Sequence, residues 1–490
     1  MERESAWKRY DEDQLAELEQ LAAGYIDFIS ENKTEREFSA AAIRSAEAAG
    51  YESLDAAISA GRKLAPGDKV WATMRNKAVI LVQLGARPLT DGMNILGAHI
   101  DSPRLDVKQN PLYESSELAF MDTHYYGGIK HYQWVTVPLA LHGVIAKKDG
   151  SVVDVKIGED ADDPVFCISD LLIHLANQQM GKKANEVVEG EALDILVGNR
   201  PLVVRDEDGE AKEQKDPVKA FALKLLADKY GIEEEDFLSA ELEVVPAGRA
   251  RDLGFDRSMV LGYGQDDRVC AYTSLVAQLA VAGEELDRAA VCVLVDKEEI
   301  GSVGATGMAS QFFENTIAEI MELAGEGGIL PLRRALAASA MLSSDVSAGF
   351  DPAYASVFEA KNSAYLGHGL VFNKYTGARG KSGSNDARAE YMARIRKIMD
   401  DAGVQFQTCE LGKVDAGGGG TIAYIPAKYG MDVIDSGVAV LSMHSPWDGH
   451  QQSRYLRGRT RLRGVPARIT SRGAKAKTVL ARNLGKPSIN

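Results

Sequence analysis

Two adjacent acidic residues, Glu298 and Glu299, come shortly after the apolar run Ala289–Leu294, within the segment Val-Asp-Lys-Glu-Glu-Ile-Gly-Ser at 295–302. The apolar run predicts a buried strand, and open α/β sheets place their active sites at the carboxyl ends of strands. Two neighbouring carboxylates can divide the chemistry, because one can ligate a metal while the other takes a proton from a water held by that metal. Taken alone, the pair is more typical of a charged turn.

Four further residues of metal-ligating type occupy similar positions. His99, Asp345 and His444 each end a run of apolar or small residues. Asp266 follows a Gly-bearing turn and precedes the helix-compatible run 269–279, so it also suits a helix N-cap. Each of these residues has a plain structural explanation when taken singly. With Glu299 they supply two His and three carboxylates, a mixture that zinc favours.

Asp101 lies two residues after His99. A ligating His usually gives its second ring N–H to a carboxylate, which fixes its tautomer and raises its basicity. A His-x-Asp segment at a strand end therefore predicts Asp101 as the residue that orients His99.

The motifs together resemble the M18 family of metallo-aminopeptidases, the aspartyl aminopeptidase and aminopeptidase I group, and especially its bacterial members. The resemblance covers roughly residues 15–448 and rests on the segments GAHIDSPRLD, THYYGGIKHYQWV, YGQDDRVCAYTSL, DKEEIGS, LSSDVSAG and LSMHSP. It implies two zinc ions, for which Co²⁺ or Mn²⁺ are alternatives. The implied roles are His99 and Asp345 at the first ion, Asp266 as the bridge, Glu299 and His444 at the second ion, Glu298 as general base and Asp101 as orienter of His99.

The resemblance also implies an α/β fold, with a zinc-exopeptidase-like mixed sheet flanked by helices and an inserted β-rich dimerisation domain. Within the sequence, helical apolar spacing recurs over 14–30 and 34–49, whereas β-like runs broken by acidic loops begin near 106. We therefore expect a discontinuous catalytic domain at 1–105 and 247–448 and an insert at 106–246. Residues 171–178 favour a short helix in the insert. Family relatives imply a dimer-based homo-oligomer, a dodecamer.

The expected function is hydrolysis of the N-terminal peptide bond of peptides, with a preference for Asp or Glu as the first residue. Lys374 is the candidate partner of an acidic substrate side chain, although a solvated basic loop explains it as well. Asp267 is a candidate for binding the substrate's amino group. His174, in the insert, is a candidate for the active site of a neighbouring subunit, and an ordinary core or interface His is the alternative.

Two other functions remain compatible with the same ligands. One is a different dizinc amidohydrolase, such as a deacylase or a glutamyl-type aminopeptidase. The other is a metal-binding oligomeric shell without turnover. Substrate assays and metal analysis would separate these possibilities.

Composition sets limits on the class of protein. The 490 residues are 45% hydrophobic and 26% charged, with a formal net charge of −15, which disfavours a general nucleic-acid binder. We expect a cytoplasmic protein, because the N-terminus lacks the apolar core of a signal peptide and no stretch approaches about 18 uninterrupted apolar residues. The four cysteines are scattered without Cys-x-x-Cys spacing, so we expect reduced thiols rather than a disulfide framework.

Residues 449–490 differ from the rest of the chain in charge. They contain 11 Lys or Arg and no acidic residue, which leaves 45 basic and 71 acidic residues and a net charge of about −26 in residues 1–448. A basic arm that binds RNA or a membrane is one interpretation. The preferred interpretation is a replaced, disordered terminus, because the change falls where the family resemblance ends.

Overall fold

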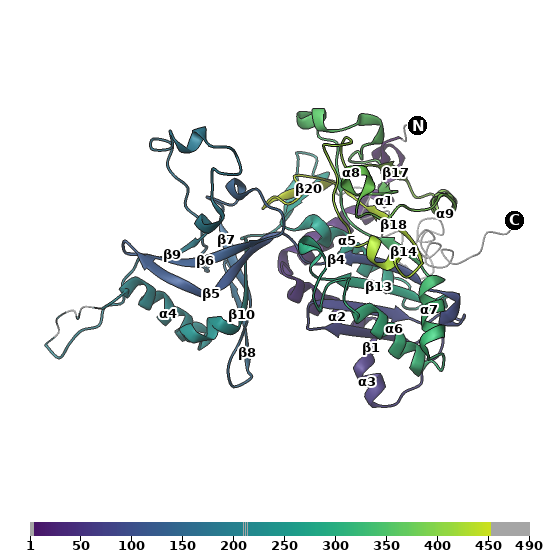
Figure 1. Cartoon of the computed structure of the whole chain (residues 1–490), viewed down its shortest axis with the longest axis horizontal. Coiled ribbons are helices and arrows are strands. Elements are labelled where there is room, and N and C mark those ends of the chain that lie inside the picture. Colours follow the sequence, from purple (N-terminus) through teal and green to yellow (C-terminus); the bar gives the residue numbers. More distant parts are fainter. Residues whose placement is uncertain (1–3, 209, 211, 213, 452–490) are drawn as a thin grey trace. The chain divides into compact units, whose positions relative to one another are not determined.

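The computed structural model describes residues 4–208, 210, 212 and 214–451 (Figure 1). The chain forms two compact units. Among the described residues, the main unit comprises segments 4–102, 250–443 and 448–451, and the inserted unit comprises 103–249 and 444–447. The sequence predicts the two main boundaries at 105/106 and 246/247. Most of the basic tail, residues 452–490, lies outside the described residues.

A nine-stranded mixed sheet forms the centre of the main unit, in agreement with the expected fold class. Four adjacent strands in the order β13, β4, β14 and β18 are parallel, whereas β3 and β16 pair antiparallel with β13 and β18. Across the sheet, the strands are β1 (Glu52–Ser53), β2 (Lys69–Met74), β3 (Ala78–Gln83), β13 (Ala290–Val295), β4 (Asn94–His99), β14 (Ala340–Ser343), β18 (Asp432–Gly437), β16 (Leu370–Asn373) and β17 (Phe406–Cys409).

Both faces of this sheet are covered, which explains why its central strands read as uninterrupted apolar runs rather than alternating ones. In β3, Val79 and Leu81 belong to one apolar core, and Ile80 and Val82 to the other. The first core contains residues of α1 (Glu12–Glu31), α2 (Glu35–Ala48), α5 (Gln265–Leu279) and α9 (Ala389–Asp401). The second contains residues of α3 (Leu54–Ser59), α6 (Phe312–Leu323), α7 (Ile329–Ala337) and α10 (Tyr424–Ala427).

The predicted N-terminal helices are confirmed, and both begin at capping boxes. The Asp11 side chain accepts the backbone N–H of Gln14 at the start of α1, and Thr34 accepts that of Glu37 at the start of α2. The Gln14 and Glu37 side chains in turn accept the backbone N–H groups of Asp11 and Thr34. Backbone N–H groups at the start of each helix, which have no partner within the helix, are thus hydrogen-bonded locally.

A smaller five-stranded sheet lies in the main unit and contains the last described residues. Its strands, in order, are β11 (Arg251–Leu253), β12 (Met259–Gly262), β20 (Asp448–Gln451), β19 (Ala439–Leu441) and β15 (Ser347–Ala348). β20 pairs antiparallel with both β12 and β19. The regular structure therefore continues three residues into the segment that its charge assigned to the tail.

The inserted unit is β-rich. Its six-stranded sheet is antiparallel, and one helix, α4 (Pro217–Tyr230), accompanies it (Figure 1). In sheet order the strands are β8 (Val152–Ile157), β7 (Leu139–Ala146), β10 (Ala240–Pro246), β5 (Arg104–Ser115), β6 (Leu118–Tyr126) and β9 (Ile195–Gly198).

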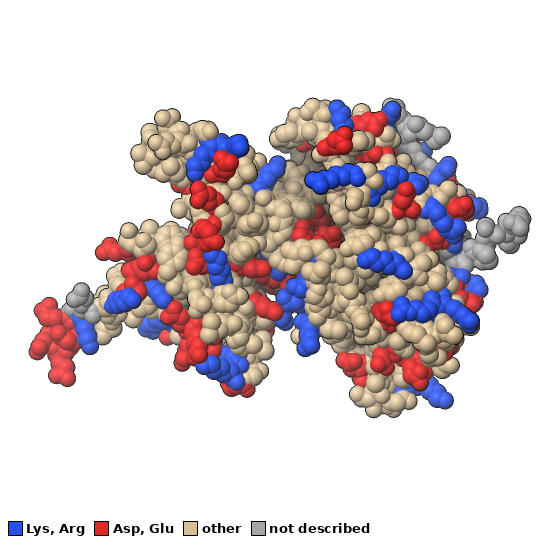
Figure 2. Space-filling view, in the orientation of Figure 1, with Lys and Arg blue, Asp and Glu red and all other residues tan. Residues whose placement is uncertain are grey.

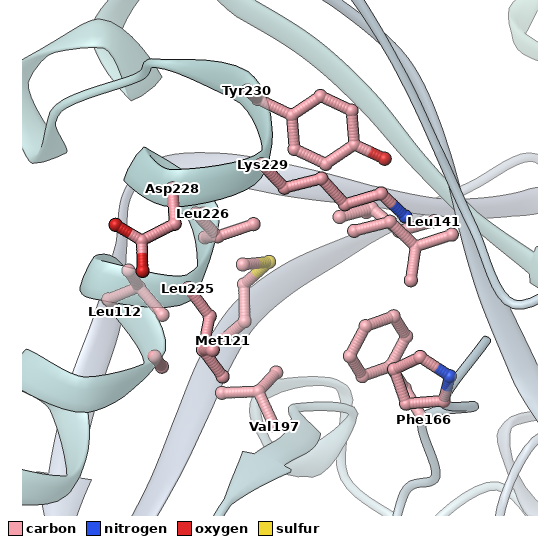
Figure 3. Close-up of a pocket in the computed structure, with 13 residues that line it drawn as sticks. Leu112, Met121, Leu141, Phe166, Val197, Leu225, Leu226, Asp228, Lys229 and Tyr230 are labelled. Carbon is pink, nitrogen blue, oxygen red and sulfur yellow. The ribbon is translucent and has the colours of Figure 1, made fainter. Parts of the chain in front are cut away.

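Between α4 and this sheet lies a cavity of about 480 Å³ lined mainly by aliphatic and aromatic side chains (Figure 3). Leu112, Met121 and Leu141 line it from the sheet, and Leu225 and Leu226 from the helix. Of the residues of α4, only Val218 is buried, so the helix packs loosely against the sheet.

The expected helix at 171–178 is absent, and consecutive turns occupy 173–178 instead. Leu171, Leu172, Ile173 and Leu175 are exposed in this segment, so no packed apolar face is available there to stabilise a helix. Among the described residues, no helix is both long enough and apolar enough to cross a membrane.

Candidate metal centre

His99 is the last residue of β4, and its side chain is almost completely buried. Its Nδ1 lies 3.2 Å from Oδ1 of Asp101 and 3.0 Å from the Asp101 carbonyl oxygen. Its Nε2 lies 3.3 Å from Oδ1 of Asp266 and 4.0 Å from Oε2 of Glu298. Asp101 therefore faces one ring nitrogen and leaves Nε2 directed toward the carboxylates, which is the arrangement of an oriented ligating histidine.

Asp266 lies at the start of α5 but does not cap it. Gly264, with φ of 68°, occupies the N-cap position, and Asp266 has extended backbone angles (φ −79°, ψ 109°). The Ser102 hydroxyl donates to the Asp266 carbonyl oxygen at 2.6 Å, and Oδ2 of Asp448 accepts the Asp266 backbone N–H at 3.3 Å. The Asp266 carboxylate thus lies beside His99 rather than on the helix end.

Asp345 comes two residues after β14, next to β4 in the sheet. A ligand atom of His99, one of Asp266 and one of Asp345 lie within 4.8 Å of one another. The parallel pairing of β4 with β14 brings the ends of these strands to the same edge of the sheet, so residues far apart in sequence meet there.

Glu298 and Glu299 begin a short 3₁₀ turn (Glu298–Ile300) just after β13. Their backbone N–H groups donate to the two carboxylate oxygens of Asp101, each at 3.2 Å. A ligand atom of each glutamate also lies within 4.8 Å of one of His99. Asp101 therefore contacts both the imidazole and the acidic turn.

The pKa values of Asp345 and His99 are both raised in this cluster. Burial raises the pKa of Asp345 well above its usual range, and the charges of Asp267 and Asp266 raise it further. Burial disfavours the charged form of His99, but hydrogen bonds to Asp101 and Asp266 and the nearby Glu298 charge raise its pKa well above its usual value. The cluster thus binds protons more tightly than separate exposed groups would, because its carboxylates are buried close to one another.

This donor set fits a zinc ion. Imidazole nitrogen and carboxylate oxygen are ligands that zinc accepts, and the oriented Nε2 of His99 faces the carboxylates. A divalent cation would replace the attracted protons and neutralise the buried charge. His99, Asp266 and Asp345 would hold it, and Glu298 and Glu299 lie at the same edge.

The remaining predicted residues are Asp267 in the main unit and His444 and His174 in the inserted unit. Asp267 is fully buried next to Asp266. His444 lies in segment 444–447 of the inserted unit, where its Nδ1 is 2.8 Å from the Gly128 carbonyl oxygen. His174 is exposed in the same unit.

Lys374 directly follows β16 and forms an ion pair with Asp386, which Lys381 also contacts at 2.9 Å. Figure 2 shows basic side chains over the part of the main unit that carries α8 (Ala378–Lys381) in Figure 1. The Lys374 ammonium therefore belongs to a cluster of two lysines, Lys374 and Lys381, that share the carboxylate of Asp386.

Sequence reasoning missed Asp448. Its carboxylate is almost completely buried and accepts the backbone N–H groups of Gln265 and Asp266, at 3.2 and 3.3 Å. Burial and the Asp266 charge raise the pKa of Asp448 to about 7, although the Gln265 N–H opposes this. Asp448 stands after the last motif, and only its acidic type at the start of a strand could have indicated a role.

Comparisons with known proteins identify the family of this chain. The model of the family described as aminopeptidase I zinc metalloprotease (M18) matches residues 28–458. A probable M18 family aminopeptidase 1 from Clostridium acetobutylicum is 59% identical over 447 residues, which span 91% of this chain and 94% of that protein.

Solved structures show the same relationship. The crystal structure of aminopeptidase I from Clostridium acetobutylicum has a TM-score of 0.88 at 52% identity, over 99% of this chain and 100% of that one. The M18 aminopeptidase from Thermotoga maritima also has a TM-score of 0.88, at 39% identity, over 98% of this chain and 100% of that one. The chain therefore belongs to the M18 family of aminopeptidase I zinc metalloproteases, and it is a metallo-aminopeptidase.

Proposed function

We propose that this aminopeptidase works with two zinc ions and that Glu298 is its general base. The observation that carries the proposal is the convergence of His99, Asp266, Asp345 and both glutamates at one edge of the sheet. His99 and Asp345 would hold the first ion and Asp266 would bridge. Glu299 and, as the sequence predicts, His444 would hold the second. When bound, paired zinc ions polarise the scissile carbonyl and lower the pKa of a water.

The protein's own groups supply the proton transfers. Oε2 of Glu298 lies 4.0 Å from the ligating nitrogen of His99, so its carboxylate stands beside the ligand set, where the base is needed. It would take the proton of the attacking water and return it to the leaving amine. Asp101 fixes the orientation of the His99 ring during this cycle.

The function is tested by release of free amino acid from unblocked peptides, with and without a chelator. We expect chelator-sensitive release that zinc restores. Release from N-acylated substrates alone would instead favour a deacylase, and bound zinc without any release would favour the inactive shell.

The glutamate roles are tested by Glu298→Gln, with Glu299→Gln as the matched control. We expect Glu298→Gln to keep its zinc and to lose about 10²- to 10⁴-fold in kcat, because proton transfer contributes that much to catalysis. Glu299→Gln should lose zinc. Elemental analysis that shows the opposite pattern would reverse the two roles.

A preference for Asp or Glu as the first substrate residue is also proposed. Lys374 and Lys381 surround the single carboxylate of Asp386, so this group keeps a net positive charge that suits an acidic side chain. A peptide series starting with Asp, Glu, Leu or Ala tests the preference. Lys374→Met should lower kcat/KM for the acidic peptides and leave the Leu peptide unchanged, and equal losses for all four would remove Lys374 from the pocket.

We further propose a homo-oligomer built from dimers through the inserted unit. Leu171, Leu172, Ile173 and Leu175 are exposed together, which is typical of a contact surface. His174 lies among them and is proposed to serve a neighbouring subunit's site.

The S. cerevisiae mApe1 dodecamer shares the fold at 18% identity, with a TM-score of 0.72. Light scattering measures the mass, and a monomer at micromolar concentration would refute the assembly. The cytoplasmic location stays a prediction.

A further inference from the structure

The loop that carries Glu298 and Glu299 has an unfavourable backbone. It leaves β13 at Val295 and returns to the isolated bridge between Asp296 and Gly307. Lys297 has φ of 69° and Ser302 has φ of 60°, values that residues with a Cβ rarely adopt. Such a conformation persists only where the surrounding structure imposes it.

One restraint on this loop is the Asp101 carboxylate, which accepts the backbone N–H groups of Glu298 and Glu299. A second carboxylate, Asp296, holds the two ends of the loop. Its Oδ1 accepts the Lys297 backbone N–H at 2.7 Å, and its Oδ2 accepts the Thr306 hydroxyl at 2.6 Å. The Asp296 backbone N–H also donates to the Thr306 carbonyl oxygen at 3.2 Å.

The two side chains that join the ends of the loop are almost completely buried. Asp296 is 1% exposed and Thr306 is 4% exposed. Next to them the loop closes tightly, because a Cβ on Gly307 would lie 2.3 Å from the Ser302 carbonyl oxygen. A buried hydrogen bond to a carboxylate is stronger than one that competes with water, so the Thr306 hydroxyl is an effective restraint.

We propose that Asp296 and Thr306 are positioning residues that close the 297–305 loop and so hold the Glu298 carboxylate in place for proton transfer. Neither residue touches the substrate in this proposal. It rests on the proposed role of Glu298 as general base. A small displacement of a reacting group lowers the rate strongly, so loss of the restraint reduces kcat by about 10- to 100-fold.

Thr306→Val tests the proposal, because valine keeps the shape of threonine and removes only the hydroxyl. We expect kcat to fall about 10- to 100-fold, with zinc content and KM close to those of the unmodified enzyme. Thr306→Ser restores the hydroxyl and should recover most of kcat. The KM-against-kcat split and the serine rescue are readouts that general destabilisation would not produce.

Thr123→Val is the matched control. Thr123 is a buried threonine of the inserted unit whose hydroxyl donates to the Leu193 carbonyl oxygen at 2.7 Å. Thr123→Val should lower the unfolding temperature, by less than Thr306→Val because its hydroxyl bonds a neutral carbonyl, and should leave kcat unchanged. Equal kcat in Thr306→Val and the unmodified enzyme, or equal losses in Thr306→Val and Thr306→Ser, would overturn the proposal.

Failure of the positioning role and failure of the general-base role give different results in these experiments. If Glu298→Gln abolishes turnover and Thr306→Val does not lower it, only the positioning role fails. If Glu298→Gln remains active, the general-base assignment fails, and the effect of Thr306→Val no longer concerns that proton transfer.

Discussion

The two units of this protein both bury charged side chains, but they balance them differently. In the inserted unit, Arg104 is within 3.2 Å of Glu243 and 2.8 Å of Asp106, and Nε2 of His142 lies 3.0 Å from Glu159. In the main unit, Asp266, Asp267 and Asp345 are buried together around one imidazole.

The difference separates a structural use of buried charge from a functional one. Paired charges satisfy each other and need nothing further, whereas clustered carboxylates repel and raise each other's pKa values. The main unit therefore gives up stability at the edge of its sheet, and a bound cation would restore it by mass action.

The largest effect that separates the two units should come from Asp345→Asn. We expect zinc affinity and activity to fall by about 10²-fold or more, since even partners of metal ligands contribute 10- to 100-fold. The metal-free variant should nevertheless be at least as stable as the metal-free parent, because one of the repelling buried charges is gone. Zinc titration and thermal unfolding of both metal-free proteins measure this. A less stable metal-free variant would show that Asp345 supports the fold.

An intermediate effect is expected for Glu243→Gln in the inserted unit. This change should lower the stability of the fold, whereas Asp345→Asn should not lower that of the metal-free protein. The change leaves the buried Arg104 guanidinium with Asp106 as its remaining carboxylate, so stability should fall by about 1–3 kcal/mol, whereas zinc content stays normal. Urea unfolding gives the stability difference. Glu191→Gln is a control, since Glu191 pairs with Lys108 on the surface and its loss should have no measurable effect. Equal stability of Glu243→Gln and the parent would remove the contrast between the units.

The last effect depends on pH and concerns Asp435, which is fully buried in β18 and accepts the Thr421 hydroxyl at 2.6 Å. Burial raises the pKa of Asp435 to about 7, although the Thr421 hydroxyl opposes this. Its pKa in the unfolded chain is about 4, so the folded protein binds the proton more tightly. Deprotonation therefore costs the metal-free protein stability as the pH rises from about 4 to about 7.

Asp435→Asn removes this titration. The stability of the metal-free variant relative to the parent should rise across the same pH window and level off above about pH 7. Denaturation at several pH values between about 5 and 8 measures the difference. Parallel stability curves for the two proteins would show that Asp435 is already ionised without cost.

The sequence alone predicts the helices and strands that have local signals. The helical apolar spacing over 14–30 and 34–49 corresponds to α1 and α2, and the apolar runs before His99 and Glu298 form buried strands. His99, Asp345, His444 and Glu299 could be found because each follows a run of apolar or small residues, whereas Asp266 could be found from the Gly-bearing turn before it. Asp448 and Asp296 could not, because their roles depend on contacts with backbone groups and a hydroxyl that only the folded chain brings together.

The position of β20 has a consequence for how the protein is made. Asp448, its first residue, holds the backbone of Gln265 and Asp266, and β20 pairs with β12, which immediately precedes that segment. During synthesis, the candidate ligands at 99, 266, 299 and 345 leave the ribosome long before residue 448. Contacts between distant segments form late, so the clamp on Asp266 forms only when nearly the whole chain has been made. A chain released before residue 448 therefore lacks the hydrogen bonds that hold the backbone of Gln265 and Asp266.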